Sequence, residues 1–238
     1  MNTTQHPSPE VLADYASGAL RLSHALCVAT HIELCSSCKA EVQKLQSLGG
    51  QLLEEQFESS PQSQQASESL VDMKSSLLDS LDDYDNLDSA EEISPITAIA
   101  EPAEDSSGYR IPSTLRQFIT ENYDRLEWSV ISTSIKIATL CKDKDGTQVA
   151  LTRVKPGGKM PHHSHTGDEI TVVLEGSFSD EDGLYKKGDI VFRKADEKHS
   201  PVVTNDGECI CLAVMEGPIQ FTGFFTRWLN PLMRWQYT

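Results

Sequence analysis

The second half of the chain is a series of short β-rich runs, and this pattern limits the fold more than any other feature. Turn signals that contain glycine, such as Asp145-Gly146 and Asp206-Gly207, separate the runs. Many short strands at close spacing predict a small barrel or sandwich. A helical segment is expected just before them, at about 113–123. The runs themselves occupy residues 135–140, 149–154, 170–174 and 209–214.

The first 50 residues have the periodicity of helices. Ser8 followed by Pro9 is a helix start, because a capping side chain precedes proline at the first helical position. Glycines mark expected helix ends. The three predicted helices run from Pro9 to Gly18, over about 20–34, and from about 36 to the pair Gly49-Gly50.

The net charge of -16 belongs almost entirely to the middle of the chain. Residues 51–109 hold 15 of the 36 acidic residues and a single base, Lys74. A segment rich in Ser, Gln, Glu and Asp cannot bury enough apolar surface to form a core, so most of it is interpreted as linker. Apolar residues at helical spacing predict one amphipathic helix within it, over about 68–83.

Composition argues against several classes of protein. An acidic chain lacks the basic footprint of direct nucleic-acid binding. No apolar run approaches the roughly 20 residues that span a bilayer, and the start of the chain does not resemble a secretory signal. We therefore expect no membrane segment and a cytoplasmic location. In that reducing compartment the six cysteines favour metal binding over disulfides.

One candidate metal site lies where the second predicted helix meets the third. His31, Cys35 and Cys38 follow the spacing His-x3-Cys-x2-Cys. Residues four apart lie on one helix face, so His31 and Cys35 can converge on one ion. Cys-x2-Cys at a turn presents two thiolates together, as tetrahedral zinc requires. His24 is a poor fourth ligand, because seven helical residues place it about 10 Å from His31. His6 precedes the first helix and can fold back, so we predict His6 as the fourth ligand. Cysteines that merely pack in a helical core, or that act as a redox switch, remain the alternatives.

A second candidate metal site lies among the strands. His163 and His165 are two residues apart, so on a strand both side chains point to the same side, into a barrel. Glu169 follows after a short turn. His162 faces away from His163 on such a strand and is excluded. The alternative is a histidine-rich loop that binds no metal.

The residues around this site match the first motif of cupin barrels, Gly157-x5-His163-x-His165-x3-Glu169-x6-Gly176. The resemblance implies that His199 of the second motif, which begins at Gly188, is the fourth ligand. Lys194 and Asp196 depart from this second motif, where proline and glycine are usual, while His199 keeps its spacing. Three histidines and a glutamate suit zinc or another divalent transition metal.

The N-terminal residues resemble the zinc-binding anti-sigma domain, with His6, Leu12, Tyr15, Gly18 and the stretch from Ala29 to Val42 in matching positions. Together with the cupin motif, the chain resembles the ChrR-type anti-sigma factors. The resemblance implies an α+β two-domain protein, with an N-terminal zinc-binding helical bundle and a C-terminal all-β cupin (double-stranded β-helix) barrel. We expect the anti-sigma domain at residues 1–85, an acidic linker at 86–110 and the cupin domain at 111–238.

The function that this resemblance implies is regulation of transcription, without catalysis. The helical domain would sequester an extracytoplasmic-function sigma factor from core RNA polymerase. The cupin would control release under oxidative stress, by singlet oxygen or an organic hydroperoxide. The alternative is a cupin metalloenzyme, of dioxygenase or isomerase type, with a helical zinc-binding appendage. Cys209 and Cys211 share one strand face, and packing, redox sensing or an extra ligand all remain open for them.

Overall fold

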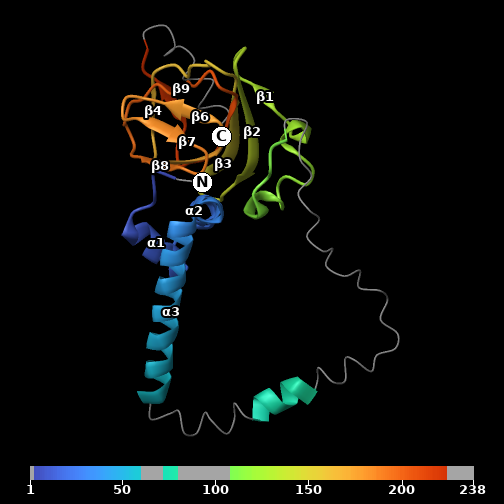
Figure 1. Ribbon diagram of the computed structural model, residues 1–238, viewed down its shortest axis with the longest axis vertical. Coiled ribbons are helices and arrows are strands. Elements are labelled where there is room, and N and C mark those ends of the chain that lie inside the picture. The colour runs from blue at the N-terminus through green and yellow to red at the C-terminus, as the bar shows by residue number, and fades with distance from the viewer. Residues whose placement is uncertain (1–2, 60–71, 80–107, 224–238) are drawn as a thin grey trace, which may run out of the picture. The chain divides into compact units, whose positions relative to one another are not determined.

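The structure is a computed structural model that describes residues 3–59, 72–79 and 108–223 (Figure 1). The chain packs as two compact units. One unit joins residues Met1–Gln43 to Ala103–Thr238, and the other is Lys44–Pro102. The first 43 residues therefore share a unit with the strands, although some 60 residues separate them in the sequence.

Three helices open the chain, as predicted: α1 (Pro9–Ala16), α2 (Leu22–Leu34) and α3 (Ser36–Ser59). The predicted start of the first helix is confirmed, because the Ser8 hydroxyl accepts a hydrogen bond from the Val11 amide at 3.4 Å. Gly18 follows the helix with a φ of 74°, a left-handed conformation that glycine adopts without a steric penalty.

The predicted end of the third helix is wrong. Gly49 and Gly50 do not stop α3, which continues to Ser59 and so includes nine residues that we had interpreted as linker. Each glycine inside a helix costs only about 1 kcal/mol relative to alanine. Residues 51–56, Gln-Leu-Leu-Glu-Glu-Gln, are all strong helix formers and outweigh that cost.

The single helix predicted at 113–123 is also wrong. The chain forms two short 3-10 turns instead, η1 (Ser113–Leu115) and η2 (Tyr123–Arg125). Leu115, Ile119 and Tyr123 are buried at a helix-like spacing, which explains the prediction. The Asn122 side chain accepts hydrogen bonds from the Asp124 and Arg125 amides and starts a separate turn.

The strands form the predicted barrel, the double-stranded β-helix of cupins. A six-stranded sheet in the order β1-β2-β3-β10-β5-β8 faces a three-stranded sheet, β7-β6-β9, and a pair, β11-β4. The strands are β1 (Ser129–Val130), β2 (Ile135–Lys142), β3 (Gln148–Val154), β4 (His163–His165), β5 (Glu169–Glu175), β6 (Ser177–Ser179), β7 (Leu184–Lys186), β8 (Ile190–Arg193), β9 (Val202–Val203), β10 (Cys209–Met215) and β11 (Ile219–Phe221).

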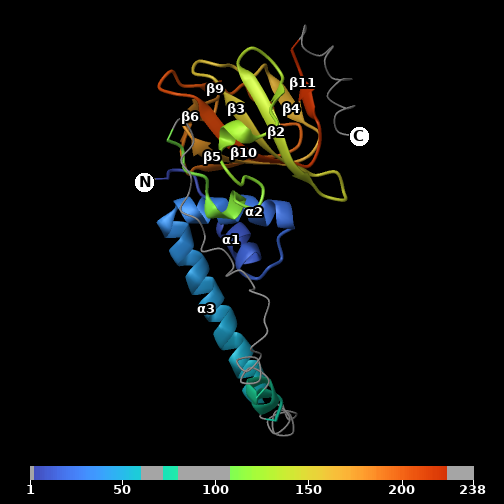
Figure 2. The same cartoon turned by 90° about the vertical axis from the view of Figure 1, so that its right-hand side faces the viewer.

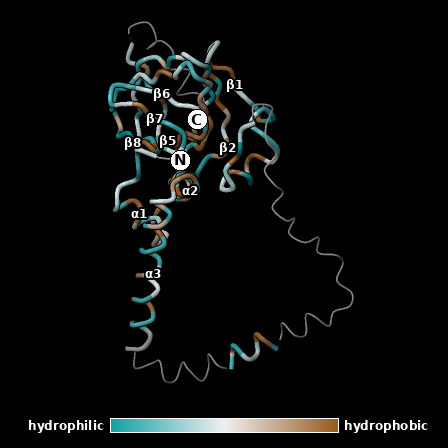
Figure 3. The backbone as a smooth tube through the Cα atoms, in the orientation of Figure 1, coloured by the Kyte–Doolittle hydropathy of each residue, from teal (hydrophilic) through white to brown (hydrophobic). Residues whose placement is uncertain are grey.

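Helix α2 packs on the large sheet of the barrel, against β5, β8 and β10, and it also contacts η1 (Figure 2). Cys27 and Val28 of this helix are completely buried. The hydropathy of the chain agrees with this placement, since α2 is more apolar along its length than α3 (Figure 3). One helix therefore belongs both to the N-terminal module and to the covering of the barrel.

Of the helix predicted at 68–83, the described residues 72–79 are helical. The rest of that segment, and the linker over residues 86–107, lie outside the described residues. Among the described helices, none is long and apolar enough to cross a membrane.

Candidate metal centres

The structure brings the four residues of the first predicted site together. One potential ligand atom from each of His6, His31, Cys35 and Cys38 lies within 4.8 Å of all the others. His31 comes from the last turn of α2, Cys38 from the first turn of α3, and His6 from the segment before α1. Two thiolates and two imidazoles at this separation suit tetrahedral zinc.

Cys35 reaches the cluster by a route that the sequence did not predict. We expected His31 and Cys35 to share one helix face, but α2 ends at Leu34. Cys35 has an extended backbone, with φ -122° and ψ 105°, and the next residue begins α3. The change of direction between two helices therefore aims the Cys35 thiol at the cluster.

His24, which we rejected as a ligand, lies elsewhere. Its Nε2 atom is 3.2 Å from Glu216 Oε1, and it is absent from the group of converging atoms.

Both ring nitrogens of His31 agree with a metal-binding role. Nδ1 lies 2.7 Å from the carbonyl oxygen of Gly188, to which it donates as an N–H. That bond leaves Nε2 as the lone-pair nitrogen, and Nε2 is buried with no hydrogen-bond partner among the described residues. Burial lowers the pKa of His31, so the imidazole is neutral near pH 7. An orphaned buried nitrogen beside two thiols fits a metal ion.

The two thiols have different environments. Burial alone would raise the pKa of Cys35, but hydrogen bonds from Ser37 and Thr3 lower it to about 6. Burial and the adjacent Cys35 thiolate raise the pKa of Cys38 to about 11. The protein therefore stabilises one thiolate of the pair, and a cation that neutralises both charges fits this arrangement.

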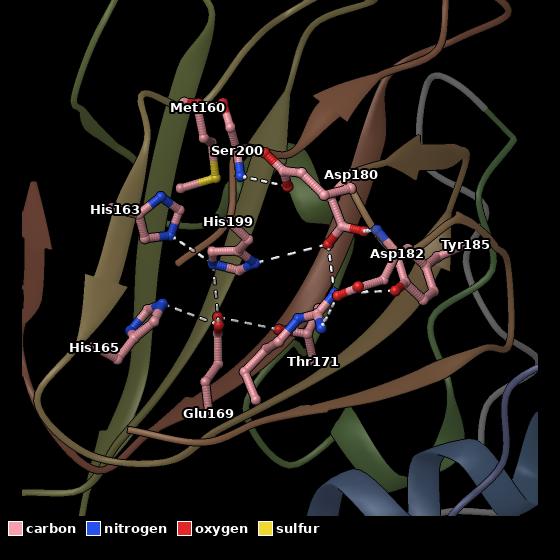
Figure 4. Close-up of polar contacts among 12 residues, drawn as sticks. Met160, His163, His165, Glu169, Thr171, Asp180, Asp182, Tyr185, His199 and Ser200 are labelled. Carbon is pink, nitrogen blue, oxygen red and sulfur yellow. Dashed lines mark hydrogen bonds and ion pairs between the residues drawn. The ribbon is translucent and has the colours of Figure 1, made fainter. Parts of the chain in front are cut away.

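The second predicted site lies inside the barrel (Figure 4). His163 and His165 project from β4, and Glu169 begins β5. His199 pairs with His163 of β4 in an isolated antiparallel β-bridge. The Nε2 atoms of His163 and His199 are 2.9 Å apart. Glu169 Oε2 lies 3.0 Å from His165 Nε2 and 3.8 Å from His199 Nε2. One ligand atom from each of the three histidines lies within 4.8 Å of the other two, and Glu169 lies beside them, against His165 and His199.

Neighbouring groups turn these donor atoms toward one another. His163 Nδ1 donates to the Pro161 carbonyl at 2.8 Å, and Thr171 Oγ1 donates to Glu169 Oε1 at 3.2 Å. The Nε2 atom of the buried His165 faces Glu169 Oε2, while its Nδ1 atom has no hydrogen-bond partner among the described residues. A metal ion held by this imidazole and the Glu169 carboxylate would compensate both buried groups.

The pKa shifts of His163, His199 and Glu169 favour their metal-binding forms. Burial, with the neighbouring His199 and His165, lowers the pKa of His163 to about 4. Burial also lowers the pKa of His199. Burial alone would raise the pKa of Glu169, but the adjacent histidines lower it to about 2. Near pH 7 His163 and His199 are therefore neutral imidazoles and Glu169 is a carboxylate.

The cluster opens into a cavity in the barrel with mostly apolar walls. Cys209 and Cys211 are part of those walls, with their sulfur atoms 3.6 Å apart. Both thiols point inward, as the alternation on β10 predicted, but neither belongs to the group of converging ligand atoms. His162 turns outward and lies 3.0 Å from Thr222 Oγ1.

One residue of this site, behind His199, was not predicted from the sequence. Asp180, between β6 and β7, is buried, with Oδ2 3.8 Å from His199 Nδ1 and 2.6 Å from the Arg193 guanidinium. A carboxylate on the far nitrogen of a ligand histidine orients the ring. A lone aspartate in a turn with no motif spacing gives no signal for this role.

Comparison with known proteins places the chain in a family. Residues 116–220 match the ChrR cupin-like domain family. Over 236 residues, 98% of this chain and 100% of the relative, the sequence is 30% identical to the anti-sigma-E factor ChrR of Cereibacter sphaeroides. The chain belongs to the ChrR family of anti-sigma factors.

A solved structure extends this likeness to the whole ChrR fold. The crystal structure of Rhodobacter sphaeroides SigE in complex with the anti-sigma ChrR matches with a TM-score of 0.64 and 26% identity. The match covers 90% of this chain and 100% of that one. Both ChrR relatives are named as anti-sigma factors, so the family is one of regulators rather than enzymes, and the metalloenzyme alternative has no support from them.

Proposed function

We propose that this protein is a zinc-dependent anti-sigma factor that holds an extracytoplasmic-function sigma factor away from core RNA polymerase. The relationship to ChrR over nearly the whole chain carries the proposal, because the solved relative is in complex with a sigma factor. The partner is thus a protein and not a nucleic acid, in keeping with the net charge of -16. The protein acts in the cytoplasm, where sigma factors meet RNA polymerase.

The helical module, residues 1–85, is the part that we assign to sigma binding. Leu48, Leu52 and Leu53 of α3 are each more than half exposed, at 53%, 57% and 56%. Exposed leucines on neighbouring helical turns mark a protein-binding surface. Zinc held by His6, His31, Cys35 and Cys38 fixes α2 and α3 at their junction and so presents that surface.

The cupin domain, residues 111–238, is the part that we assign to regulation, with residues 86–110 as the tether. His163, His165, Glu169 and His199 would hold zinc or another divalent transition metal there. A metal there would supply a Lewis-acidic centre, and the thiols of Cys209 and Cys211 in the cavity wall would supply oxidisable groups. Singlet oxygen or an organic hydroperoxide is the signal that we expect to release the sigma factor.

Binding is tested with the full chain and purified extracytoplasmic-function sigma factors of the same organism, with zinc present. We expect one sigma factor to co-purify with the protein. Leu52→Asp should weaken binding at least about 10-fold, because a charge replaces an apolar contact. Leu184→Asp, which places the same charge at an exposed leucine of the barrel, is the matched control. If the unaltered chain retains no sigma factor, the proposal is refuted.

The zinc dependence has its own test. A Cys35→Ala, Cys38→Ala double variant should lose sigma binding together with one metal per chain. Unchanged sigma binding by this variant would show that the metal does not hold the binding surface.

A further inference from the structure

The turn between β7 and β8 contacts the N-terminal metal cluster directly. The carbonyl oxygen of Gly188, in this turn, accepts the 2.7 Å hydrogen bond from His31 Nδ1. That bond selects the tautomer in which His31 Nε2 faces His6 and the two cysteines. A backbone atom of the barrel therefore orients a ligand of the helical module.

The next residue, Asp189, holds the segment that carries His6. Its carboxylate is fully buried and accepts hydrogen bonds from the Thr4 amide at 2.6 Å, the Thr4 hydroxyl at 3.0 Å and the Gln5 amide at 3.1 Å. Its own turn contributes the Lys186 amide at 2.9 Å. The Ile190 amide donates to the Gln5 carbonyl at 3.3 Å, which adds a backbone bond between the same two segments. Residues 4 and 5 are thus fixed immediately before His6.

Thr3 completes the connection. Its hydroxyl donates to Cys35 Sγ at 3.1 Å, and its methyl carbon lies against Gly188. A Cβ atom on Gly188 would lie 2.6 Å from that methyl, and Gly188 has a φ of 94°. The barrel turn and the N-terminal segment therefore approach as closely as a glycine allows.

We propose that Gly188 and Asp189 are positioning residues for the N-terminal metal centre, so that docking on the barrel and metal binding by the helical module stabilise each other. Residues that orient ligand histidines in this way typically contribute 10–100-fold to metal affinity. By thermodynamic linkage, metal binding must favour the docked turn by the same factor. The inference rests on the proposed zinc site and names the path by which the barrel regulates it.

Cobalt titration of the full chain tests the effect on affinity. Thiolate-bound Co²⁺ gives a charge-transfer band, and loss of that band in the Cys35→Ala, Cys38→Ala variant assigns it to the N-terminal site. We expect Asp189→Asn to weaken Co²⁺ binding about 10-fold, since an amide offers donors where Thr4 and Lys186 also donate. Asp206→Asn, an exposed aspartate of the same barrel, should change it less than 2-fold. Equal affinities for the two variants overturn the proposal.

A comparison of two glycines distinguishes the effect of the contact between Gly188 and Thr3 from the effect of backbone strain. Gly188 and Gly146 both have φ of 94°, but a Cβ on Gly146 meets no atom within 4 Å. Alanine at either position suffers the same left-handed strain. Gly188→Ala should weaken Co²⁺ binding about 10-fold and Gly146→Ala should not. If both substitutions weaken Co²⁺ binding equally, destabilised folding explains the weaker binding and the proposal is overturned.

Hydrogen exchange tests the reverse direction. In Cys38→Ser, which lacks one ligand, the amides of Thr4, Gln5 and Ile190 should exchange about 10-fold faster, while those of β10 keep their rates. Unchanged exchange at these three amides would show that the metal does not stabilise the docked turn. Neither titration nor exchange uses a sigma factor, so failure of the proposed partner leaves both results valid. At saturating Co²⁺, Asp189→Asn should bind the sigma factor as the unaltered chain does.

Discussion

Asp196 has a backbone conformation that few side chains adopt. Its φ of 67° is the sole left-handed value among the non-glycine residues that the structure describes. Its amide donates to the carbonyl of the ligand His165 at 2.9 Å, so the conformation ties the loop to β4. This is the position where the cupin motif usually has glycine, and the departure leaves the loop intact because aspartate tolerates the left-handed region better than most residues.

Restoring the usual residue should therefore have little effect. In Asp196→Gly, relief of the left-handed strain opposes the greater flexibility of glycine in the unfolded chain. We expect the free energy of unfolding, measured by urea denaturation, to change by less than about 1 kcal/mol. Metal content should stay the same. Loss of the barrel metal would show that the Asp196 side chain has a role of its own.

Asp180 matters in a different way, because it lies against the far nitrogen of His199. Asp180→Asn keeps the shape but removes the charge that Arg193 and His199 share. We expect the barrel metal to bind about 10-fold more weakly, as measured by chelator competition. Asp182→Asn is the control, because Asp182 contacts the same arginine from an exposed position. Similar losses in both variants would contradict an orienting role for Asp180.

Among the secondary-structure elements, glycines have opposite consequences in α3 and in the barrel. Gly176, between β5 and β6, has a φ of 73°, and a Cβ there would lie 2.2 Å from the Glu208 carbonyl oxygen. Gly49 and Gly50 lie exposed inside α3, and a Cβ on either would meet no atom within 4 Å. The first glycine is required by a close approach of two backbones, and the second pair is merely tolerated.

Gly176→Ala should destabilise the barrel by about 3 kcal/mol or more, because backbone strain adds to a clash with a carbonyl that cannot move freely. Thermal unfolding of the full chain measures this change. A melting temperature equal to that of the unaltered chain would mean that the β5–β6 corner is loose.

Gly49→Ala should act in the opposite direction. Alanine is favoured over glycine in an exposed helix interior by about 1 kcal/mol. Amide exchange over residues 44–56 should slow about 5-fold, while the barrel amides keep their rates. Faster exchange in α3 would show that the glycine conformation is needed.

Periodicity predicted the elements better than their ends. The strand runs at 149–154 and 209–214 lie within β3 and β10, since a short β-rich apolar run bounded by turn signals is typical of a buried strand. Motif spacing also predicted the eight proposed ligands and their division between two sites. Gly188 and Asp180 were missed as contacts of ligand histidines, because a backbone carbonyl has no sequence signature and pairing across 157 residues depends on the assembled fold.

For the whole molecule, the two clusters predict two metal ions per chain. Elemental analysis of the purified protein should give about two. The Cys35→Ala, Cys38→Ala variant should retain only the barrel metal, and a His163→Ala, His199→Ala variant only the N-terminal one. Unequal donor sets, two thiolates in one site and none in the other, make the first the more selective for zinc. Loss of both metal ions in either variant would mean that the two sites are not independent.

The packing of helix α2 also affects where proteins of this family can be truncated. A chain cut after residue 85 keeps every ligand of the first cluster, yet it uncovers Cys27 and Val28, which the strands of the barrel now cover. Such a fragment would tend to self-associate through the uncovered face, and this would mimic a weakened affinity for its partner. A boundary that is clear along the chain is thus a poor place to truncate the protein, because one apolar interface joins the segments on either side of it.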